Sequence, residues 1–211
     1  TSSLIVGAMA GDDLRFLKTY QYVNDRVVSR SVVGALIGGA GKIGIGSAHG
    51  FAPISKPHHV TRSHANVVFE LDHRPAASVY EEYVGSDLVH QMQSGGLSRQ
   101  GIAYPLGIQC ENSGQWLLRN IVSLQPDGSL SCSGEMPEHA LVQLMIGSRE
   151  LAFEGARNAA QAAIRSLNQV ACVLVFDSIL RRKLLGERHA AAEIAHIRQI
   201  VGPAIPLAGC Y

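Results

Sequence analysis

The sequence lacks long apolar runs, and it lacks a surplus of charge of either sign. No uninterrupted apolar run approaches the ~20 residues that a membrane-spanning helix needs, so we expect no membrane insertion. The 18 Lys and Arg side chains are balanced by 17 Asp and Glu, which leaves a net charge of +1 at pH 7. This balance offers no basic surplus to neutralise a phosphate backbone. We therefore expect no nucleic-acid partner, with a local basic patch as the one exception.

Cysteines are few and widely spaced, and none of the four belongs to a CxxC pair. Neither a zinc site nor a redox dithiol is indicated, so we expect reduced thiols at Cys110, Cys132, Cys172 and Cys210. The first residues lack the basic start of a signal peptide, which favours a cytoplasmic location. The missing initiator Met and the apolar last residues 206–211 indicate a chain cut at both ends.

The sequence does have enough apolar material for a substantial core, because 46% of its 211 residues are hydrophobic and only 17% are charged. This length fits one domain or two closely joined halves. The first half is rich in strand patterns. Residues 18–23 and 26–37 flank Asn24-Asp25, which tolerate the positive φ of a tight hairpin. Residues 42–46 alternate with period two and predict a buried strand that delivers His49 to a loop.

Further strand, turn and helix signals follow. Residues 66–71 predict a strand, and Pro75 suits the first turn of a helix that runs through Tyr83. The Gly- and Ser-rich residues 93–98 predict a flexible joint. Residues 125–128 read Gln-Pro-Asp-Gly and predict a hairpin between the apolar runs on either side.

The last third of the chain alternates helices and strands. Apolar residues recur at helical spacing over 148–167 and 187–201, and each set predicts an amphipathic helix. The continuous apolar run 170–176 is typical of a central strand covered on both faces, and a last strand begins at residue 205. We therefore predict an α+β (mixed α/β) fold, with a strand-rich N-terminal half and a C-terminal half in which amphipathic helices pack on a mixed sheet.

Residues 38–50 are rich in glycine, which invites comparison with phosphate-binding loops. The P-loop pattern requires Gly and Ser or Thr at positions where this chain has Leu36 and Ile43. The dinucleotide pattern requires a third Gly where the chain has His49. We therefore interpret these glycines as residues that permit sharp turns and close strand packing, and we expect no nucleotide cofactor.

Histidines are numerous, but their spacing does not indicate a metal site. His58, His59 and His64 cluster in one segment, yet a site would need a further carboxylate or Cys nearby. We interpret them as solvated loop histidines. Glu193 and His196 have the spacing of a di-iron bundle, but no second pair accompanies them, and we place both on the polar face of their helix.

The sequence also gives no indication of a catalytic nucleophile. No Gly-x-Ser-x-Gly elbow is present, and Cys172 lies in an apolar run where its thiol should be unreactive. His49 stands at a predicted strand end, where ligand contact and a structural hydrogen bond are both open. Asp177 and Arg181 follow the predicted central strand. An Arg fork there would suit a ligand carboxylate, although a surface arginine at a helix start is the other interpretation.

Three short motifs occur in order in the first half. They are His-Gly-aromatic-x-Pro at 49–53, Val-Thr-Arg-Ser at 60–63 and Glu-Leu-Asp-x-x-Pro-Ala with a later Tyr at 70–80. This order resembles the N-terminal part of FIST domains. The second half resembles the C-terminal FIST segment at residues 104–107, 119–121, 128–138, 142–145, 175–186 and 206–211. The resemblance implies one segment over 1–73, truncated at its start, and another over 74–211, truncated at its end.

The chain departs from the family pattern at two places: Cys210 replaces an aromatic, and Asp177-Ser178 replace a segment that often contains cysteine. The resemblance implies a cytoplasmic sensory domain of signal transduction that binds a small molecule, with amino acids as proposed ligands and signalling output domains or proteins as partners. It implies no catalytic residues, and we expect no cofactor or metal. The candidate ligand contacts, chosen for polarity and motif position, are His49, Thr61, Arg62, Arg119, Asp177 and Arg181.

Two alternatives to a sensor remain open. An uncharacterised hydrolase or transferase would use His49 with Asp72 or Asp177, and it predicts His49 within hydrogen-bonding reach of a carboxylate. A ligand-free protein-interaction scaffold predicts a large exposed apolar patch and no pocket. A sensor instead predicts a concave pocket between the two halves with convergent Arg side chains.

Overall fold

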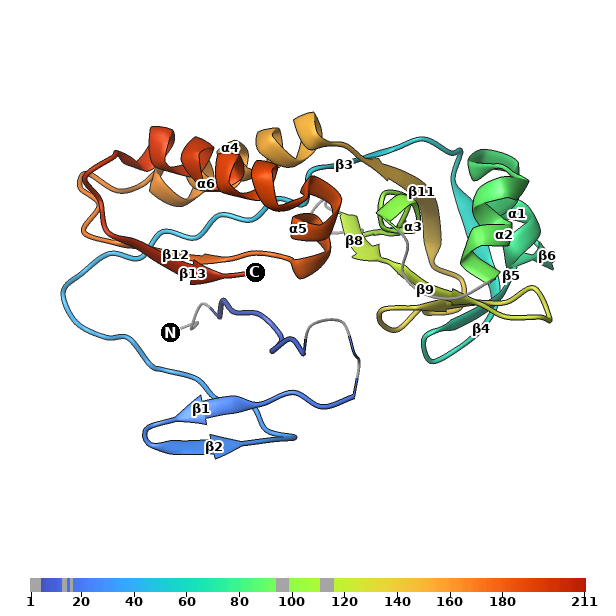
Figure 1. Cartoon of the computed structure of the whole chain (residues 1–211), viewed down its shortest axis with the longest axis horizontal. Coiled ribbons are helices and arrows are strands. Elements are labelled where there is room, and N and C mark those ends of the chain that lie inside the picture. The colour runs from blue at the N-terminus through green and yellow to red at the C-terminus, as the bar shows by residue number, and fades with distance from the viewer. Residues whose placement is uncertain (1–4, 13–14, 16, 94–98, 111–115) are drawn as a thin grey trace.

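The computed structural model describes residues 5–12, 15, 17–93, 99–110 and 116–211. Of the predicted flexible joint at 93–98, only residue 93 lies within the described residues. Figure 1 shows a large sheet with helices at one side of the molecule, and a helical layer over a pair of short strands at the other. The α+β class predicted from the sequence is confirmed.

The large sheet is antiparallel and follows the order β8-β7-β11-β4-β5-β10-β9, with β3 paired to β11 and β6 to β5. Its strands are β3 (Phe51–Pro53), β4 (His58–His64), β5 (Val67–Leu71), β6 (Arg74–Pro75), β7 (Leu106–Gln109), β8 (Trp116–Arg119), β9 (Ile121–Leu124), β10 (Leu130–Cys132) and β11 (Leu141–Gly147). Because β4 pairs with β11 and β5 with β10, segments from both halves of the sequence share one sheet.

Helices α1 (Ala76–Val84), α2 (Ser86–Gln93) and α3 (Arg99–Ile102) accompany this sheet. Pro75, predicted for the first turn of a helix, directly precedes α1 as its N-cap residue. A proline there leaves no amide hydrogen unpaired. Buried side chains of α1, such as Val79 and Tyr80, join the sheet residues Leu71 and Val142 in the main core.

The second layer contains α4 (Arg149–Ile164), α5 (Ile179–Leu185), α6 (Glu187–Val201) and the parallel strands β12 (Val173–Phe176) and β13 (Leu207–Cys210). The two predicted amphipathic helices are confirmed as α4 and α6. Helix α4 begins after Ser148, whose hydroxyl accepts the Leu151 amide and so satisfies a free helix-end donor. Ala156 and Ala160 of α4 pack against Ile197 and Val201 of α6.

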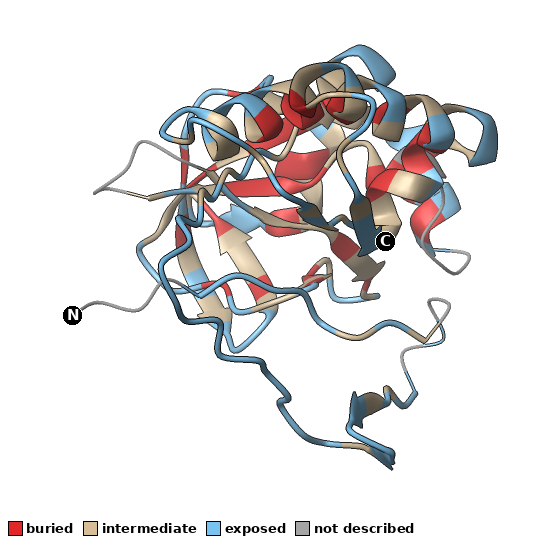
Figure 2. Cartoon of the chain, turned by 90° about the vertical axis from the view of Figure 1, so that its left-hand side faces the viewer, coloured by how far each residue is buried: buried red, intermediate tan, exposed pale blue. Residues whose placement is uncertain are grey.

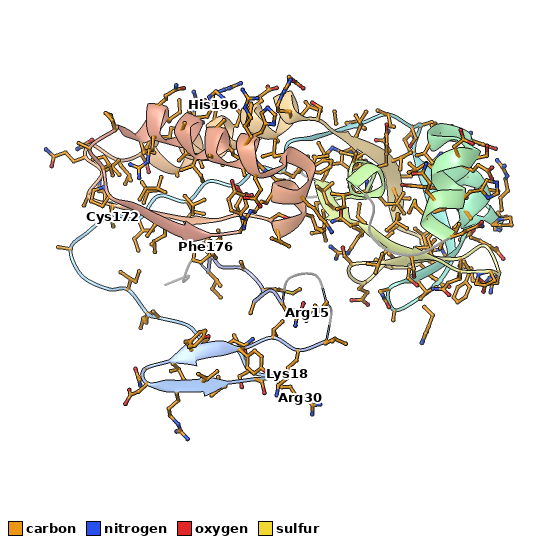
Figure 3. The ribbon with its side chains drawn as sticks, viewed as in Figure 1. Arg15, Lys18, Arg30, Cys172, Phe176 and His196 are labelled. Atoms are coloured by element: carbon orange, nitrogen blue, oxygen red, sulfur yellow. The ribbon has the colours of Figure 1, made fainter. Side chains whose placement is uncertain are left out.

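Strand β12 was predicted to be central and covered on both faces, and this prediction is wrong in the described structure. Val173 and Val175 pack against the α4–α6 core, but Leu174 is 60% exposed and Phe176 45% exposed. Figure 3 places Phe176 on the sheet and His196 on the outer side of the helices. Alternate residues of a strand point to opposite faces, so an apolar run does not reveal whether a second layer is present. Cys172, expected inside this strand, precedes it and is exposed.

The predicted buried strand at residues 42–46 is also not formed. Among the described residues this segment pairs with no strand, and it lies against α4. A Cβ on Gly44 would stand 1.8 Å from the Ala163 carbonyl oxygen, and one on Gly46 would stand 2.0 Å from that of Ala159. The period of two therefore reflects glycines that let the backbone approach a helix, while Ile45 between them is 36% exposed.

Both predicted hairpins are confirmed. The first joins β1 (Gln21–Val23) to β2 (Arg26–Val28) and turns at Asn24, whose φ is 53°, but both of its strands are shorter than predicted. The second joins β9 to β10. Figure 2 shows the N-terminal part largely exposed and the buried residues concentrated in the large sheet and the helices. Within the described ranges, no helix has both the length and the apolarity needed to cross a bilayer.

Candidate functional site

The turn between β5 and β6 has both of its residues in the left-handed backbone region. Asp72 has φ of 50° and His73 has φ of 61°. This is the conformation of a two-residue hairpin turn, in which Gly is strongly preferred at the second position. His73 therefore occupies a strained place. The turn is held by β4, since the Thr61 hydroxyl accepts the His73 amide at 2.9 Å and the His59 carbonyl accepts the Asp72 amide at 2.9 Å.

An open cavity of about 440 Å³ lies beside this turn, and we name it the hairpin cavity; it is lined by His59, Thr61, Asp72, His73 and His139. His59 and Thr61 lie two residues apart on β4 and so share a face of the strand. His139 has φ of 67°, and its amide donates to the Val60 carbonyl at 2.8 Å. Three of the lining residues thus have strained backbone, a feature that clusters at functional sites.

The Asp72 carboxylate is held from the protein side. Its Oδ1 accepts the His59 amide at 2.8 Å, and its Oδ2 lies 2.7 Å from His58 Nδ1. Partial burial opposes ionisation, but the hydrogen bonds from His59 and His58 outweigh it and hold the pKa of Asp72 below its ordinary value. The side chain is 37% exposed, so an ionised carboxylate faces the cavity.

His58 lies behind Asp72 on the inner face of the sheet, and it is only 4% exposed. Its Nδ1 carries the hydrogen shared with Asp72, because an ionised carboxylate only accepts. On its other side, Nε2 lies 3.1 Å from the hydroxyl of Tyr83 in α1, and the two rings meet edge to face. The prediction of solvated loop histidines is therefore wrong for His58, which is a buried strand residue in a hydrogen-bonded chain.

The hairpin cavity offers one carboxylate, one hydroxyl and three imidazoles. Together they can accept hydrogen bonds from a cationic group and donate hydrogen bonds to an anionic group, which suits a small polar molecule. Over the part of the chain that the structure describes, no group of three or more His, Cys, Asp or Glu is arranged to hold a metal ion.

A second polar assembly lies between the helices, and we name it the Arg181 cluster; it consists of Asp177, Arg181, Glu193 and Tyr211. Arg181 Nη2 donates to the Glu193 carboxylate and, at 2.9 Å, to the Ala152 carbonyl. Its Nη1 donates to the Ala48 carbonyl at 3.3 Å. Its Nε lies 3.5 Å from Asp177 Oδ1, longer than a normal hydrogen bond.

Glu193 is fully buried in this cluster, although it was predicted to lie on a polar helix face. Burial, opposed by Arg181 and assisted by Asp177, raises the pKa of Glu193 above its ordinary value. The hydroxyl of Tyr211 donates to Glu193 Oε2 at 3.0 Å, and burial followed by the charge of Glu193 raises the pKa of that phenol. The cluster joins α4, α5, α6 and the C-terminal residue.

His49 lies at the edge of the Arg181 cluster. Its carbonyl is 3.5 Å from Arg181 Nη1, and its Nδ1 accepts the Phe51 amide at 3.1 Å. Burial, and then the charge of Arg181, lower the pKa of His49 below its ordinary value. In the neutral ring the hydrogen is therefore on Nε2. Within the described residues, His49 forms no hydrogen bond with either Asp72 or Asp177, the carboxylates that an enzyme was expected to use.

The remaining two predicted contacts lie apart from both assemblies. Arg62 pairs with Glu70 at 2.9 Å and lies over the ring of Phe69, with 57% of its side chain exposed. Arg119 Nε donates to the Glu135 carbonyl at 2.9 Å. Both arginines therefore stabilise neighbouring strands and loops of the large sheet.

Of the six residues predicted as ligand contacts, the structure brings His49, Asp177 and Arg181 together in one place and puts Thr61 in the hairpin cavity. It adds three histidines at that cavity that were not nominated: His59, His73 and His139. One sequence signal could have pointed to His73. A two-residue turn with His73 in a position that prefers glycine is a local conflict, and such conflicts mark functional sites.

Comparison with known proteins gives two family matches that together run through nearly the whole sequence. Residues 1–74 match the FIST N domain and residues 76–211 match the FIST C domain. An uncharacterised protein of Methanocaldococcus jannaschii is 36% identical over 78 residues, which cover 37% of this chain. The matched part is only 15% of that relative's length. No solved structure matches the chain.

Proposed function

This chain belongs to the FIST family, and on that premise we propose that it is a sensory domain that binds a small molecule in the hairpin cavity. FIST domains are generally held to be sensory, ligand-binding domains of signal transduction. We propose an amino acid or related carboxylate as the ligand, and a signalling output domain or protein as the partner.

The observation that carries this proposal is the cavity itself. Its polar side chains come from three separate places, β4, the β5–β6 turn and the residues before β11, and they converge on one open space. Thr61 and Asp72 both belong to motifs that the family resemblance picked out. Such convergence of polar groups on a concavity is the usual form of a small-molecule site.

We propose binding without turnover, in the cytoplasm. His49, which an enzyme would have paired with a carboxylate, bonds to its own strand end instead. The four cysteines are free thiols, which suits a reducing compartment.

The exposed Leu174 and Phe176 are the feature that favours the scaffold alternative. A scaffold differs from a sensor in not responding to small molecules, so one experiment separates the two.

The experiment is a thermal-shift screen of the twenty L-amino acids and of simple carboxylic acids at millimolar concentration. A ligand present at one hundred times its Kd stabilises the native state by about 2.7 kcal/mol, which corresponds to about 5–10 °C in Tm for a chain of this size. We expect at least one amino acid to give such a shift, and Thr61→Ala to reduce it. If no compound raises Tm in the wild-type protein, the sensor proposal fails.

A further inference from the structure

We propose that Asp72 binds the ammonium group of the ligand, and that His58 and Tyr83 act as positioning residues that hold the Asp72 carboxylate from the buried side of the sheet. The inference rests on the proposed function and assigns a chemical class to the ligand. It requires a protonated amine as well as any carboxylate that the ligand carries.

Asp72 is the acidic member of the cavity, and the other lining residues are three histidines and a threonine. Each of its carboxylate oxygens accepts one hydrogen bond from the protein side, from His59 and from His58. A carboxylate oxygen has two lone-pair positions, so each oxygen keeps one for an outside donor. A partly exposed anion with this remaining capacity is suited to a charge-assisted hydrogen bond.

The cation that fits is organic. Throughout the described ranges, no arrangement of three or more His, Cys, Asp or Glu is suited to a metal ion, although imidazoles surround Asp72. Among the chain's own cations near Asp72, Arg74 is engaged by Glu82. Lys56 acts on Asp72 through its charge, and no hydrogen bond joins the two in the described structure. An ammonium group, with three donors and a full charge, fits the open side of the carboxylate.

The positioning role of His58 follows from its burial and its two contacts. The ring is fixed between Asp72 and Tyr83, with 2.7 Å on one side and 3.1 Å on the other. Tyr83 belongs to α1, so the chain of bonds links the cavity to a helix that packs on the sheet. A side chain locked by such a second layer of hydrogen bonds loses little freedom when a ligand binds.

The test compares matched ligands by calorimetric titration of the whole chain. Alanine is compared with propionate, and glutamate with glutarate, so that each pair differs in the amino group. We expect the amino acid of at least one pair to bind tenfold or more tightly than its des-amino partner. Equal affinity within the pairs would overturn this inference and leave the sensor proposal standing. Absence of binding by every compound, including all members of the thermal-shift panel, would overturn both.

Variants locate the effect. Asp72→Asn keeps a residue that tolerates positive φ and removes the charge, so the preference for the amino acid over its des-amino partner should disappear. The matched control is Glu70→Gln, which also replaces a carboxylate by an amide. Glu70 lies on β5, just before the turn, and pairs with Arg62. This variant should still prefer the amino acid over its des-amino partner. An unchanged preference in Asp72→Asn would refute the assignment.

Variants of the positioning residues provide a separate test, which still applies if Asp72→Asn does not fold. Tyr83→Phe should weaken binding of the amino acid by about two- to tenfold and leave binding of the des-amino acid unaffected, because only the orientation of the Asp72 carboxylate changes. His58→Asn retains a hydrogen-bond donor near the Nδ1 position, so this variant should bind the amino acid more tightly than His58→Leu does. Equal losses for both members of a ligand pair would show a merely structural role.

Discussion

The hairpin cavity and the Arg181 cluster both hold a carboxylate against a nitrogen donor, but they differ in what the carboxylate still offers. Asp72 is partly exposed, ionised and engaged only from its inner side. Glu193 is fully buried, and its partners Arg181 and Tyr211 are engaged within the protein. A carboxylate held by a nitrogen donor is thus suited to ligand binding where one side of the carboxylate is open, as at Asp72. It forms a structural cross-link where the carboxylate is enclosed, as at Glu193. Polarity alone, without burial, does not separate the two.

The largest effect that sharpens this comparison is expected for Arg181→Ala. The change leaves Glu193 and Asp177 buried without their cation, and breaking a buried pair in this way costs about 3–5 kcal/mol in the free energy of unfolding. Urea denaturation measures it. The control is Arg62→Ala at an exposed pair, for which we expect about 1 kcal/mol or less. Similar losses for both variants would mean that the cluster is not the cross-link described above.

A smaller effect is expected in the pH dependence, and its sign differs between the two assemblies. The pKa of Asp72 is lowered on folding, so its stabilisation is present above the ordinary value and is lost as pH falls through the folded value. The pKa of Glu193 is raised, chiefly by burial, so stability falls as pH rises from the ordinary value through the raised one.

Urea denaturation across acid and neutral pH checks these signs with two neutral replacements. Asp72→Asn should reduce the loss of stability as pH falls below the ordinary pKa of an aspartate. Glu193→Gln should reduce the loss of stability as pH rises above the ordinary pKa of a glutamate. A wild-type slope that survives Glu193→Gln unchanged would show that Glu193 keeps its ordinary pKa.

The smallest effect is expected for His73→Gly at the strained turn. Relief of the left-handed conformation stabilises the folded protein, and the greater freedom of glycine in the unfolded chain offsets part of the gain. We expect a net stabilisation of about 0.5–1 kcal/mol, or about 1–4 °C in Tm, together with weaker ligand binding because an imidazole leaves the cavity. A variant with lower Tm would show that His73 is held by contacts stronger than its strain.

Local patterns predicted the secondary structure well. The hairpins at Asn24 and at residues 125–128 and the helices α4 and α6 depend on turn residues and periodicity within a short segment, and all were confirmed. The resemblance to FIST domains was confirmed by the family matches. The strand predictions at residues 42–46 and for the covering of β12 were wrong, because both depend on what packs against the segment.

The site was harder to predict than the fold. Of the nominated ligand contacts, Thr61 lies at the hairpin cavity, whereas Arg62 and Arg119 lie apart from it. His58 and Glu193 were expected in solvent and are buried. His58 meets Asp72 from 14 residues away, and Arg181 meets Ala48 from 133 residues away. Neither pairing has a periodic signal.

The sequence by itself determined the family, the α+β class, the turn positions and the long amphipathic helices, because each depends on residues that are neighbours along the chain. Only the tertiary structure decided which polar side chains are open to a ligand and which are closed into the core. The reason is that the state of a carboxylate is set by its burial and its partners, and for Asp72 and Glu193 these come from segments distant in sequence.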